Sequence, residues 1–229
     1  MIYPIIGFLI ILAFLYLIYQ SKRPSGFIGL WMMKLWNRVY MPMVVWAVSQ
    51  RGHKKLFHAI LDVGVGNGES SKYLKKHFPN SRVLGIDISS TAIRAAEKLA
   101  EPGLSFEVKN VENTNLPVEK FDLITAFQTH FHWSNLTQAF LELKRILKPD
   151  GIILLAFEWS KLAYYQPDFT KQEKLENYLT DLDLHLIDSQ RKGQWILYKI
   201  VKKKEVSYET IIFMFIFCGS QELVQTICI

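Results

Sequence analysis

The middle of the chain alternates between short apolar runs and longer stretches in which apolar residues recur with helical spacing. Short apolar runs bounded by turn residues are typical of buried strands, and the stretches between them are typical of amphipathic helices. The expected strands are residues 59–63, 82–87, 105–108, 122–127 and 152–157. The expected helices are residues 69–77, 90–100 and 134–147. This order predicts an α/β domain with a mostly parallel sheet.

Polar residues mark the expected ends of these elements. Ser89 or Ser90 can cap the second helix, and Ser134 can cap the third. A further helix is predicted at residues 171–182. Two last strands, 184–188 and 195–201, flank a polar turn and predict a C-terminal hairpin.

The chain begins with an apolar run, residues 2–19, that carries no charged side chain. As a helix it would measure about 27 Å, close to the ~30 Å hydrocarbon core of a bilayer. Lys22 and Arg23 follow the run, whereas a signal peptide carries its positive charges before it. We therefore predict an uncleaved single-pass anchor, residues 1–23, with the catalytic domain facing the cytoplasm. A hairpin in one leaflet is the alternative, because Pro4 and the modest length make the span marginal.

The next segment, residues 24–58, combines aromatic and basic side chains. It contains three of the six tryptophans: Trp31, Trp36 and Trp46. Lys34 and Arg38 lie four positions apart and share one face of a helix. Such a helix suits the headgroup region of a membrane, but it also suits packing on the sheet or closing a ligand site. Pro42 is expected to end its first half.

The net charge of +6 comes from the N-terminal part of the chain. Residues 1–61 contain seven Lys or Arg and no Asp or Glu, whereas the remainder contains 20 basic and 21 acidic residues. A nucleic-acid-binding domain would spread basic residues over a face of its folded core. Nucleic acid is therefore an unlikely partner.

The last 25 residues, 205–229, have an unusual composition. The run 211–217 is strongly apolar but too short to cross a bilayer as a helix. An extra strand, a membrane-touching segment and an atypical terminus all remain open. Cys218 and Cys228 lie here without metal-ligand spacing, so we predict no metal site and two reduced thiols.

A glycine turn follows the first predicted strand. Gly64, Gly66 and Gly68 give G-x-G-x-G, and the second strand ends on Asp87. Glycines allow the backbone to approach a ligand closely, and a carboxylate at that strand end can accept hydrogen bonds from both ribose hydroxyls. Glu69 stands where a dinucleotide fingerprint requires Gly or Ala. The pattern therefore favours a nucleoside cofactor without a pyrophosphate.

Three further motifs follow in order: Phe121-Asp122-Leu123-Ile124-Thr125-Ala126-Phe127, His130-Phe131-His132-Trp133, and Arg145-Ile146-Leu147-Lys148-Pro149-Asp150-Gly151 before a run of Ile and Leu. With the glycine turn they resemble a class I S-adenosylmethionine-dependent methyltransferase of the type 11 kind, over residues 60–203. The resemblance implies a Rossmann-like sheet whose sixth and seventh strands form an antiparallel hairpin. It places the methyltransferase domain at residues 59–204.

The resemblance also implies roles for individual residues. The cofactor's methionine part would lie on the glycine turn, near Asp62, with its ribose on Asp87 and its adenine on Ile88. Asn110 stands where the family has an acid, with Glu112 as the alternative. The implied cofactor-binding residues are Asp62, Gly64, Gly66, Asn67, Gly68, Asp87, Ile88, Asn110, Val111 and Gln128.

The acceptor is predicted from what the segment after the fourth strand contains. It lacks the Asn/Asp-Pro-Pro-aromatic element that the family uses for base or amide nitrogens, so DNA, adenine in RNA and glutamine are unlikely acceptors. Together with the anchor, this favours a small acceptor that partitions into membranes: a lipid, a quinone-like ring or a lipophilic thiol. His130 and His132 are candidate bases for an acceptor that loses a proton, or else a packing feature. The alternative function is a membrane-tethered protein that binds the cofactor without methyl transfer.

Overall fold

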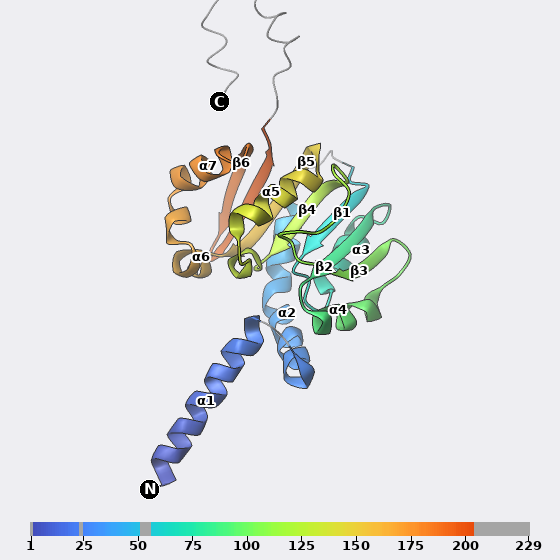
Figure 1. The fold of residues 1–229 in the computed structure, drawn as a ribbon. Coiled ribbons are helices and arrows are strands. Elements are labelled where there is room, and N and C mark those ends of the chain that lie inside the picture. The colour runs from blue at the N-terminus through green and yellow to red at the C-terminus, as the bar shows by residue number, and fades with distance from the viewer. Residues whose placement is uncertain (1, 23–24, 51–55, 204–229) are drawn as a thin grey trace, which may run out of the picture.

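The computed structural model describes residues 2–22, 25–50 and 56–203. Its centre is a seven-stranded sheet with the order β3-β2-β1-β4-β5-β7-β6 (Figure 1). The first five strands are parallel, whereas β7 runs antiparallel to both β5 and β6. The strands are β1 (Ala59–Val63), β2 (Arg82–Asp87), β3 (Leu104–Val108), β4 (Phe121–Phe127), β5 (Leu147–Glu158), β6 (Leu184–Lys192) and β7 (Trp195–Lys202).

Helices cover both faces of the sheet. Buried side chains of α2, α3 and α4 pack on one face, and those of α5, α6 and α7 pack on the other. The helices are α1 (Ile2–Lys22), α2 (Gly26–Ser49), α3 (Glu69–His77), α4 (Ser90–Ala96), α5 (Leu136–Ile146), α6 (Trp159–Tyr165) and α7 (Gln172–Thr180). Three 3-10 turns complete the described elements: Glu97–Leu99, His130–His132 and Pro167–Thr170. The Rossmann-like sheet and its antiparallel C-terminal hairpin are therefore confirmed.

The ends of the helices explain the small differences from the predicted elements. Ser89 caps α4 by accepting a hydrogen bond from the amide of Ala92. At α5 the cap is Asn135, which accepts from the amide of Gln138, and not the predicted Ser134. With Asn135 as its N-cap, α5 begins at Leu136, two residues later than expected.

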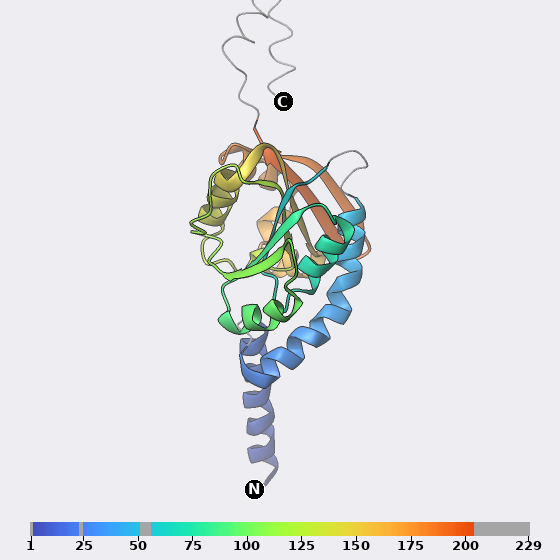
Figure 2. The same cartoon turned by 90° about the vertical axis from the view of Figure 1, so that its right-hand side faces the viewer.

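The helix α2 is continuous through Pro42, so the prediction that this residue ends its first half is wrong. Proline removes one helical hydrogen bond, but packing on a core can hold the helix together. The half of α2 after Pro42 supplies that packing, because Met43, Val44, Ala47 and Val48 are all buried. Figure 2 shows α2 lying along one side of the domain.

The predicted single-pass anchor is wrong. In the part of the chain that the structure describes, no helix combines the length and apolarity that crossing a membrane requires. The run 2–19 was already marginal because it contains Pro4, and its helix ends in a polar turn. There the side-chain nitrogen of Gln20, Nε2, donates to the Tyr16 hydroxyl at 2.7 Å and to the Ser25 hydroxyl at 2.9 Å. The inferred cytoplasmic orientation falls with the anchor, and the apolar tail at 205–229, with its two cysteines, lies outside the described residues.

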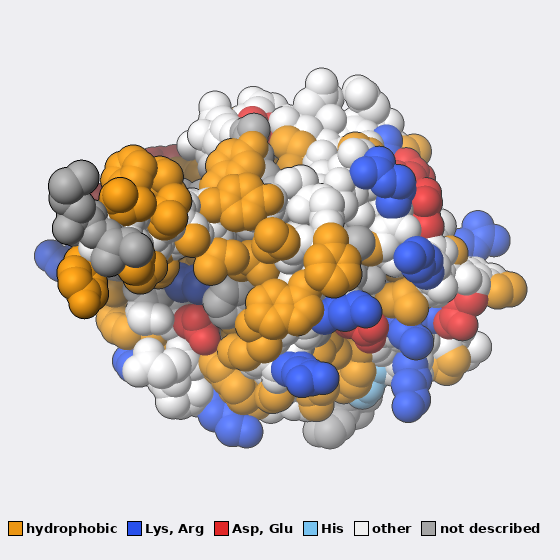
Figure 3. Space-filling model, turned by 90° about the horizontal axis from the view of Figure 1, so that it is seen from below, with side chains coloured by type: hydrophobic (Ala, Val, Ile, Leu, Met, Phe, Trp, Pro, Cys, Tyr) orange, Lys and Arg blue, Asp and Glu red, His pale blue; other side chains and the backbone are white. Residues whose placement is uncertain are grey.

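Instead, α1 projects from the domain and exposes most of its large apolar side chains. Figure 3 views the molecule from the side on which α1 projects and shows hydrophobic side chains gathered there. The two buried clusters of the described core contain no residue of α1. The domain therefore does not depend on α1 for its core.

Deleting residues 1–24 should leave the domain's melting temperature within about 2 °C of the full chain, because little apolar surface of α1 is buried. The measurement is thermal unfolding followed by circular dichroism. As a control, Met43→Ala in α2 should destabilise by about 2–5 kcal/mol, since this side chain is fully buried. A fall of more than about 5 °C on deletion would contradict this account of the core.

Candidate functional site

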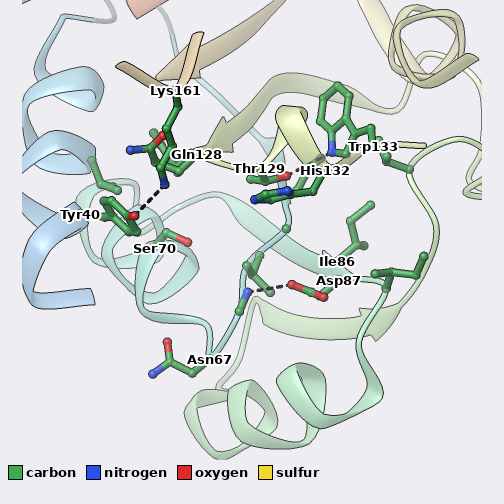
Figure 4. Close-up of a pocket in the computed structure, with 18 of the residues that line it drawn as sticks. Tyr40, Asn67, Ser70, Ile86, Asp87, Gln128, Thr129, His132, Trp133 and Lys161 are labelled. Carbon is green, nitrogen blue, oxygen red and sulfur yellow. Dashed lines mark hydrogen bonds between the residues drawn. The ribbon is translucent and has the colours of Figure 1, made fainter. Parts of the chain in front are cut away.

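A cavity of about 570 Å³ opens at the carboxyl ends of the parallel strands. It is lined by α2, the glycine turn after β1, the ends of β2, β4 and β5, the segment after β3, and α6 (Figure 4). The volume lies within the range of small-molecule and cofactor sites. Open α/β sheets bind their ligands at this edge, where the strand order reverses between β1 and β4.

The glycine turn has a backbone that other residues rarely adopt. Gly64, Gly66 and Gly68 have φ angles of 72°, 55° and 86°. A side chain at Gly64 would also overlap Thr129 at the end of β4. The amide of Gly68 donates to the carbonyl of Val65 at 2.9 Å and closes the turn. Glycine is needed here both for the conformation and for close contact with β4.

The turn is fastened to the end of β2 by its own amides. The amides of Gly64 and Val65 donate to the carbonyl of Ile86, at 2.7 and 3.2 Å. The amide of Gly66 donates to a carboxylate oxygen of Asp87 at 2.9 Å. These N–H groups therefore already have acceptors within the protein. We expect the turn to contact a ligand mainly by close packing of its backbone.

Asp87, the last residue of β2, lines the cavity. Its second carboxylate oxygen accepts from the amide of Ser89 at 2.8 Å. Burial raises the pKa of this carboxyl group, while the hydrogen bonds from Ser89 and Gly66 lower it. Each oxygen keeps a further lone pair that can accept a hydrogen bond from a ligand hydroxyl. The geometry is suited to a pair of ribose hydroxyls.

Eight of the ten predicted cofactor residues line the cavity. They are Gly64, Gly66, Asn67, Asp87, Ile88, Asn110, Val111 and Gln128. Asn110 uses its side-chain oxygen to accept from the amide of Glu112 at 3.0 Å, so its amide group is held in place beside the cavity. Among the described residues, no three potential metal ligands lie together as a metal site.

Asp62 does not line the cavity, contrary to its predicted contact with the cofactor. It is 1% exposed and accepts hydrogen bonds from the hydroxyls of Ser70, Ser71 and Thr125 at 2.6–2.8 Å. Burial raises its pKa to about 6, against the effect of these three hydroxyls. Asp62 therefore joins β1 to α3 and β4. Gly68 also lies outside the cavity lining, and a side chain there would overlap Ala96 and Phe106.

Gln128, directly after β4, has an unusual backbone and an unpaired amide. Its φ angle is 61°, and its side-chain oxygen accepts from the amide of Glu158 at 3.2 Å. Its side-chain nitrogen is buried and has no hydrogen-bond partner among the described residues. A buried unpaired donor is costly unless a ligand satisfies it. This donor beside the cavity fits a polar ligand.

The two candidate bases occupy different environments. His130 is 4% exposed and lies among the rings of Phe131, Trp133 and Phe157, with centroids 3.9–6.1 Å away. Burial, with a smaller effect from the charge of His132, lowers the pKa of His130 to about 3. His130 is therefore a packing residue, and its predicted role as a base does not fit its position. His132 lines the cavity.

Three polar residues at the cavity were not predicted from the sequence. The Lys161 ammonium on α6 donates to the Tyr40 hydroxyl on α2 at 2.7 Å, and Glu158 at the end of β5 lies close by. Burial lowers the pKa of Lys161; burial and then the charge of Glu158 raise the pKa of Tyr40 to about 12. The contact joins residues 121 positions apart, and α6 was not predicted at all. No local sequence pattern marks this contact.

Replacing His130 by Phe should change how stability depends on pH. Unfolded, this histidine binds a proton near pH 6.5, but folded it does so only near pH 3. The unfolded state thus binds more protons in this window, and wild-type stability falls as pH falls, by up to about 1.4 kcal/mol per pH unit. Denaturant unfolding from pH 7 to pH 5 should show the wild type losing about 1–2 kcal/mol relative to His130→Phe. If the free energy of unfolding depended on pH in the same way in both proteins, the pKa of His130 would not be lowered in the folded state, and this prediction would be wrong.

Comparison with known proteins agrees with this geometry. The family model described as a methyltransferase domain matches residues 61–155. Malonyl-(acyl-carrier protein) O-methyltransferase 1 of Ilyobacter polytropus is 45% identical over 84 residues, which are 36% of this chain and 30% of that protein. The 2-methyl-6-phytyl-1,4-hydroquinone methyltransferase of Synechocystis is 32% identical over 104 residues, 44% of this chain and 32% of that protein. The matched part thus spans about a third of the length of these relatives.

Solved structures share the fold. An S-adenosylmethionine-dependent methyltransferase from Aquifex aeolicus superposes with a TM-score of 0.58 at 18% identity, over 69% of this chain and 88% of that one. Geranyl diphosphate C-methyltransferase of Streptomyces coelicolor, solved with S-adenosylhomocysteine, also gives 0.58, at 15% identity, over 71% and 79% of the two chains. At these identities the solved structures show the shared fold. The match of residues 61–155 to the methyltransferase domain, together with the named methyltransferase relatives, supports an S-adenosylmethionine-dependent methyltransferase with S-adenosylmethionine as its cofactor.

Proposed function

We propose that the protein transfers a methyl group from S-adenosylmethionine to a small, lipophilic acceptor. The observation that carries the proposal is one cavity with two kinds of lining. One part is formed by the glycine turn and Asp87. The other part is formed by apolar and aromatic side chains: Val39, Met41, Val44, Phe127 and Tyr165. A polar cofactor and an apolar acceptor can therefore lie side by side.

Several relatives support this class of acceptor by their names. They include malonyl-(acyl-carrier protein), hydroquinone and sterol methyltransferases. These names include an O-methyltransferase and a C-methyltransferase, so they favour small or lipophilic acceptors without selecting one. For this chain we propose a lipid, a quinone-like ring or a thiol.

The protein's own part in the reaction is positioning. When bound, the cofactor supplies a methyl group that is already activated on a sulfonium. Asp87, Ile88 and Asn110 would fix the nucleoside, so that the methyl group faces the apolar lining near Phe127. The helix α2 contributes Val39, Tyr40, Met41 and Val44 to the lining of the cavity, on the side of the apolar residues. Holding the acceptor in line and excluding water can supply much of the rate enhancement.

A base is needed only for an acceptor that must lose a proton. His132 is the candidate, because it lines the cavity beside Thr129 and Trp133 (Figure 4). It would take the proton from a thiol or phenol as the acceptor atom attacks the methyl carbon. A carboxylate acceptor is already ionised at neutral pH and requires no base.

Asp87→Ala should weaken binding of S-adenosylmethionine about 10- to 100-fold, because two charge-assisted hydrogen bonds to the ribose are lost. Isothermal titration calorimetry measures this. Asp168→Ala is the matched control, since Asp168 is exposed on a 3-10 turn away from the cavity. Asp87 also anchors Gly66, so a melting curve must show that the variant is folded. Unchanged affinity in a folded Asp87→Ala protein would remove Asp87 from the site.

Methyl transfer from labelled cofactor to a panel of thiols, hydroquinones and long-chain carboxylic acids tests the proposed function. At least one class should be methylated by the full chain. His132→Gln should slow transfer to thiols or phenols about 10²- to 10⁴-fold and leave transfer to carboxylates unchanged. His185→Gln on β6, outside the cavity, is the control. No transfer to any class, with the cofactor bound, would contradict the proposed function.

A further inference from the structure

The amino-acid part of the cofactor needs partners that the glycine turn does not supply. S-adenosylmethionine ends in an α-carboxylate and an α-ammonium group, and both must be satisfied when they leave water. In this turn, however, the amides of Gly64, Val65, Gly66 and Gly68 already donate within the protein. Asp62, which might have accepted from the ammonium, points into the core. Other groups must therefore recognise this end of the cofactor.

The cavity itself indicates where that end would lie. With the ribose on Asp87 and the adenine toward Ile88 and Asn110, the methionine part must extend in the opposite direction, over the glycine turn. Figure 4 shows Tyr40, Gln128 and Lys161 on that far side, across the cavity from Asp87.

This end of the cavity carries one cation and one anion that do not form an ion pair with each other. Lys161 and Glu158 both line the cavity, but among the described residues they are not paired within the distance of an ion pair. Lys161 is held instead by the uncharged Tyr40 hydroxyl, and Gln128 adds its unpaired buried nitrogen. Partly buried opposite charges normally pair directly. A cation and an anion kept apart beside a cavity match a ligand that is itself a zwitterion.

We propose that Lys161 and the Gln128 amide bind the α-carboxylate of S-adenosylmethionine, and that Glu158 binds its α-ammonium. Tyr40 is a positioning residue that holds Lys161 and links α2 to α6 over this end of the cofactor. The inference rests on the proposed function, because it assumes that this cofactor occupies the cavity. Recognition of the amino-acid end then distinguishes the cofactor from nucleosides that lack it.

The test compares two ligands by titration calorimetry of the full chain. S-adenosylhomocysteine carries the amino-acid end, and 5′-methylthioadenosine has the same nucleoside and thioether without it. The wild type should bind the first more tightly. Lys161→Met should weaken S-adenosylhomocysteine binding about 10- to 100-fold and change methylthioadenosine binding less than about twofold. Glu158→Gln should show the same selectivity, and Tyr40→Phe a smaller one.

Two controls separate a lost contact from a damaged fold. Lys174→Met removes a lysine from the exposed surface of α7 and should change neither affinity. Lys161→Arg keeps the charge and should recover part of the S-adenosylhomocysteine affinity. Melting curves report whether each variant is folded, and Glu158→Gln carries the test if Lys161→Met is not.

The outcomes distinguish this inference from the proposed function. If the wild type binds S-adenosylhomocysteine but Lys161→Met binds it equally well, the inference is overturned and the proposed function stands. Equal loss of both ligands in a folded Lys161→Met protein also overturns it, because the contact would not be specific to the amino-acid end. If the wild type binds neither ligand, the proposed function fails, and the inference with it.

Discussion

The buried carboxylate of Asp62 is the contact on which the site's geometry depends. An ionised carboxylate in a protein core is costly unless hydrogen bonds satisfy it, and here three hydroxyls do so. Two of them come from the first turn of α3 and the third from β4. The glycine turn lies between β1 and α3, so fixing Asp62 to both sides fixes the span that the turn must cover. The pKa of Asp62 is about 6, above its usual value, because the effect of burial is larger than that of the three hydrogen bonds.

The glycine turn in this protein serves mainly as a shaped surface. Its amides hold it against β2, and Thr129 leaves no room for a side chain at Gly64. Polar recognition is consequently displaced to the two ends of the cavity. In the binding mode proposed above, Asp87 would serve one end, and Gln128, Glu158 and Lys161 would serve the other. This division explains why a segment far from the sequence motifs, α2, takes part in the site.

The features that could be predicted are those set by local sequence. The bounds of β1, β2 and α3 follow from short apolar runs and from the glycine turn between them, and Asp87 follows from its place at a strand end. The direction in which a side chain points was harder to predict than the place of its residue at the end of a strand. Asp62 and His130 are both at predicted site positions, but their side chains point into the core. A shift of two positions, from His130 to His132, changes a buried packing position into one that lines the cavity.

Contacts between distant segments could not be predicted in this way. No sequence motif next to Tyr40 or Lys161 identifies either as a site residue. Their contact forms only in the folded protein, where α2 and α6 lie close together. The segment 24–58 fitted two interpretations, a membrane-surface helix and a helix closing the ligand site. The second agrees with the cavity lining, since Tyr40 and Val44 belong to it. The anchor prediction failed for a related reason. The absence of charged residues is a property of composition, whereas crossing a membrane requires a helix that is both long enough and apolar enough.

The charged side chains around the cavity also affect how strongly it would bind the cofactor relative to the product. Asp87, Glu112 and Glu158 line it, against Lys109 and Lys161. Lys109 is already paired with Glu107 outside the lining, at 3.3 Å, so the excess of negative charge facing a ligand is larger than the count suggests. The sulfonium of S-adenosylmethionine is a cation, and its charge disappears when the methyl group leaves. A lining with excess negative charge would therefore attract the cofactor more strongly than the uncharged thioether product, which would favour replacement of product by fresh cofactor. The same attraction opposes the loss of charge during transfer, so the acceleration must come from alignment and exclusion of water.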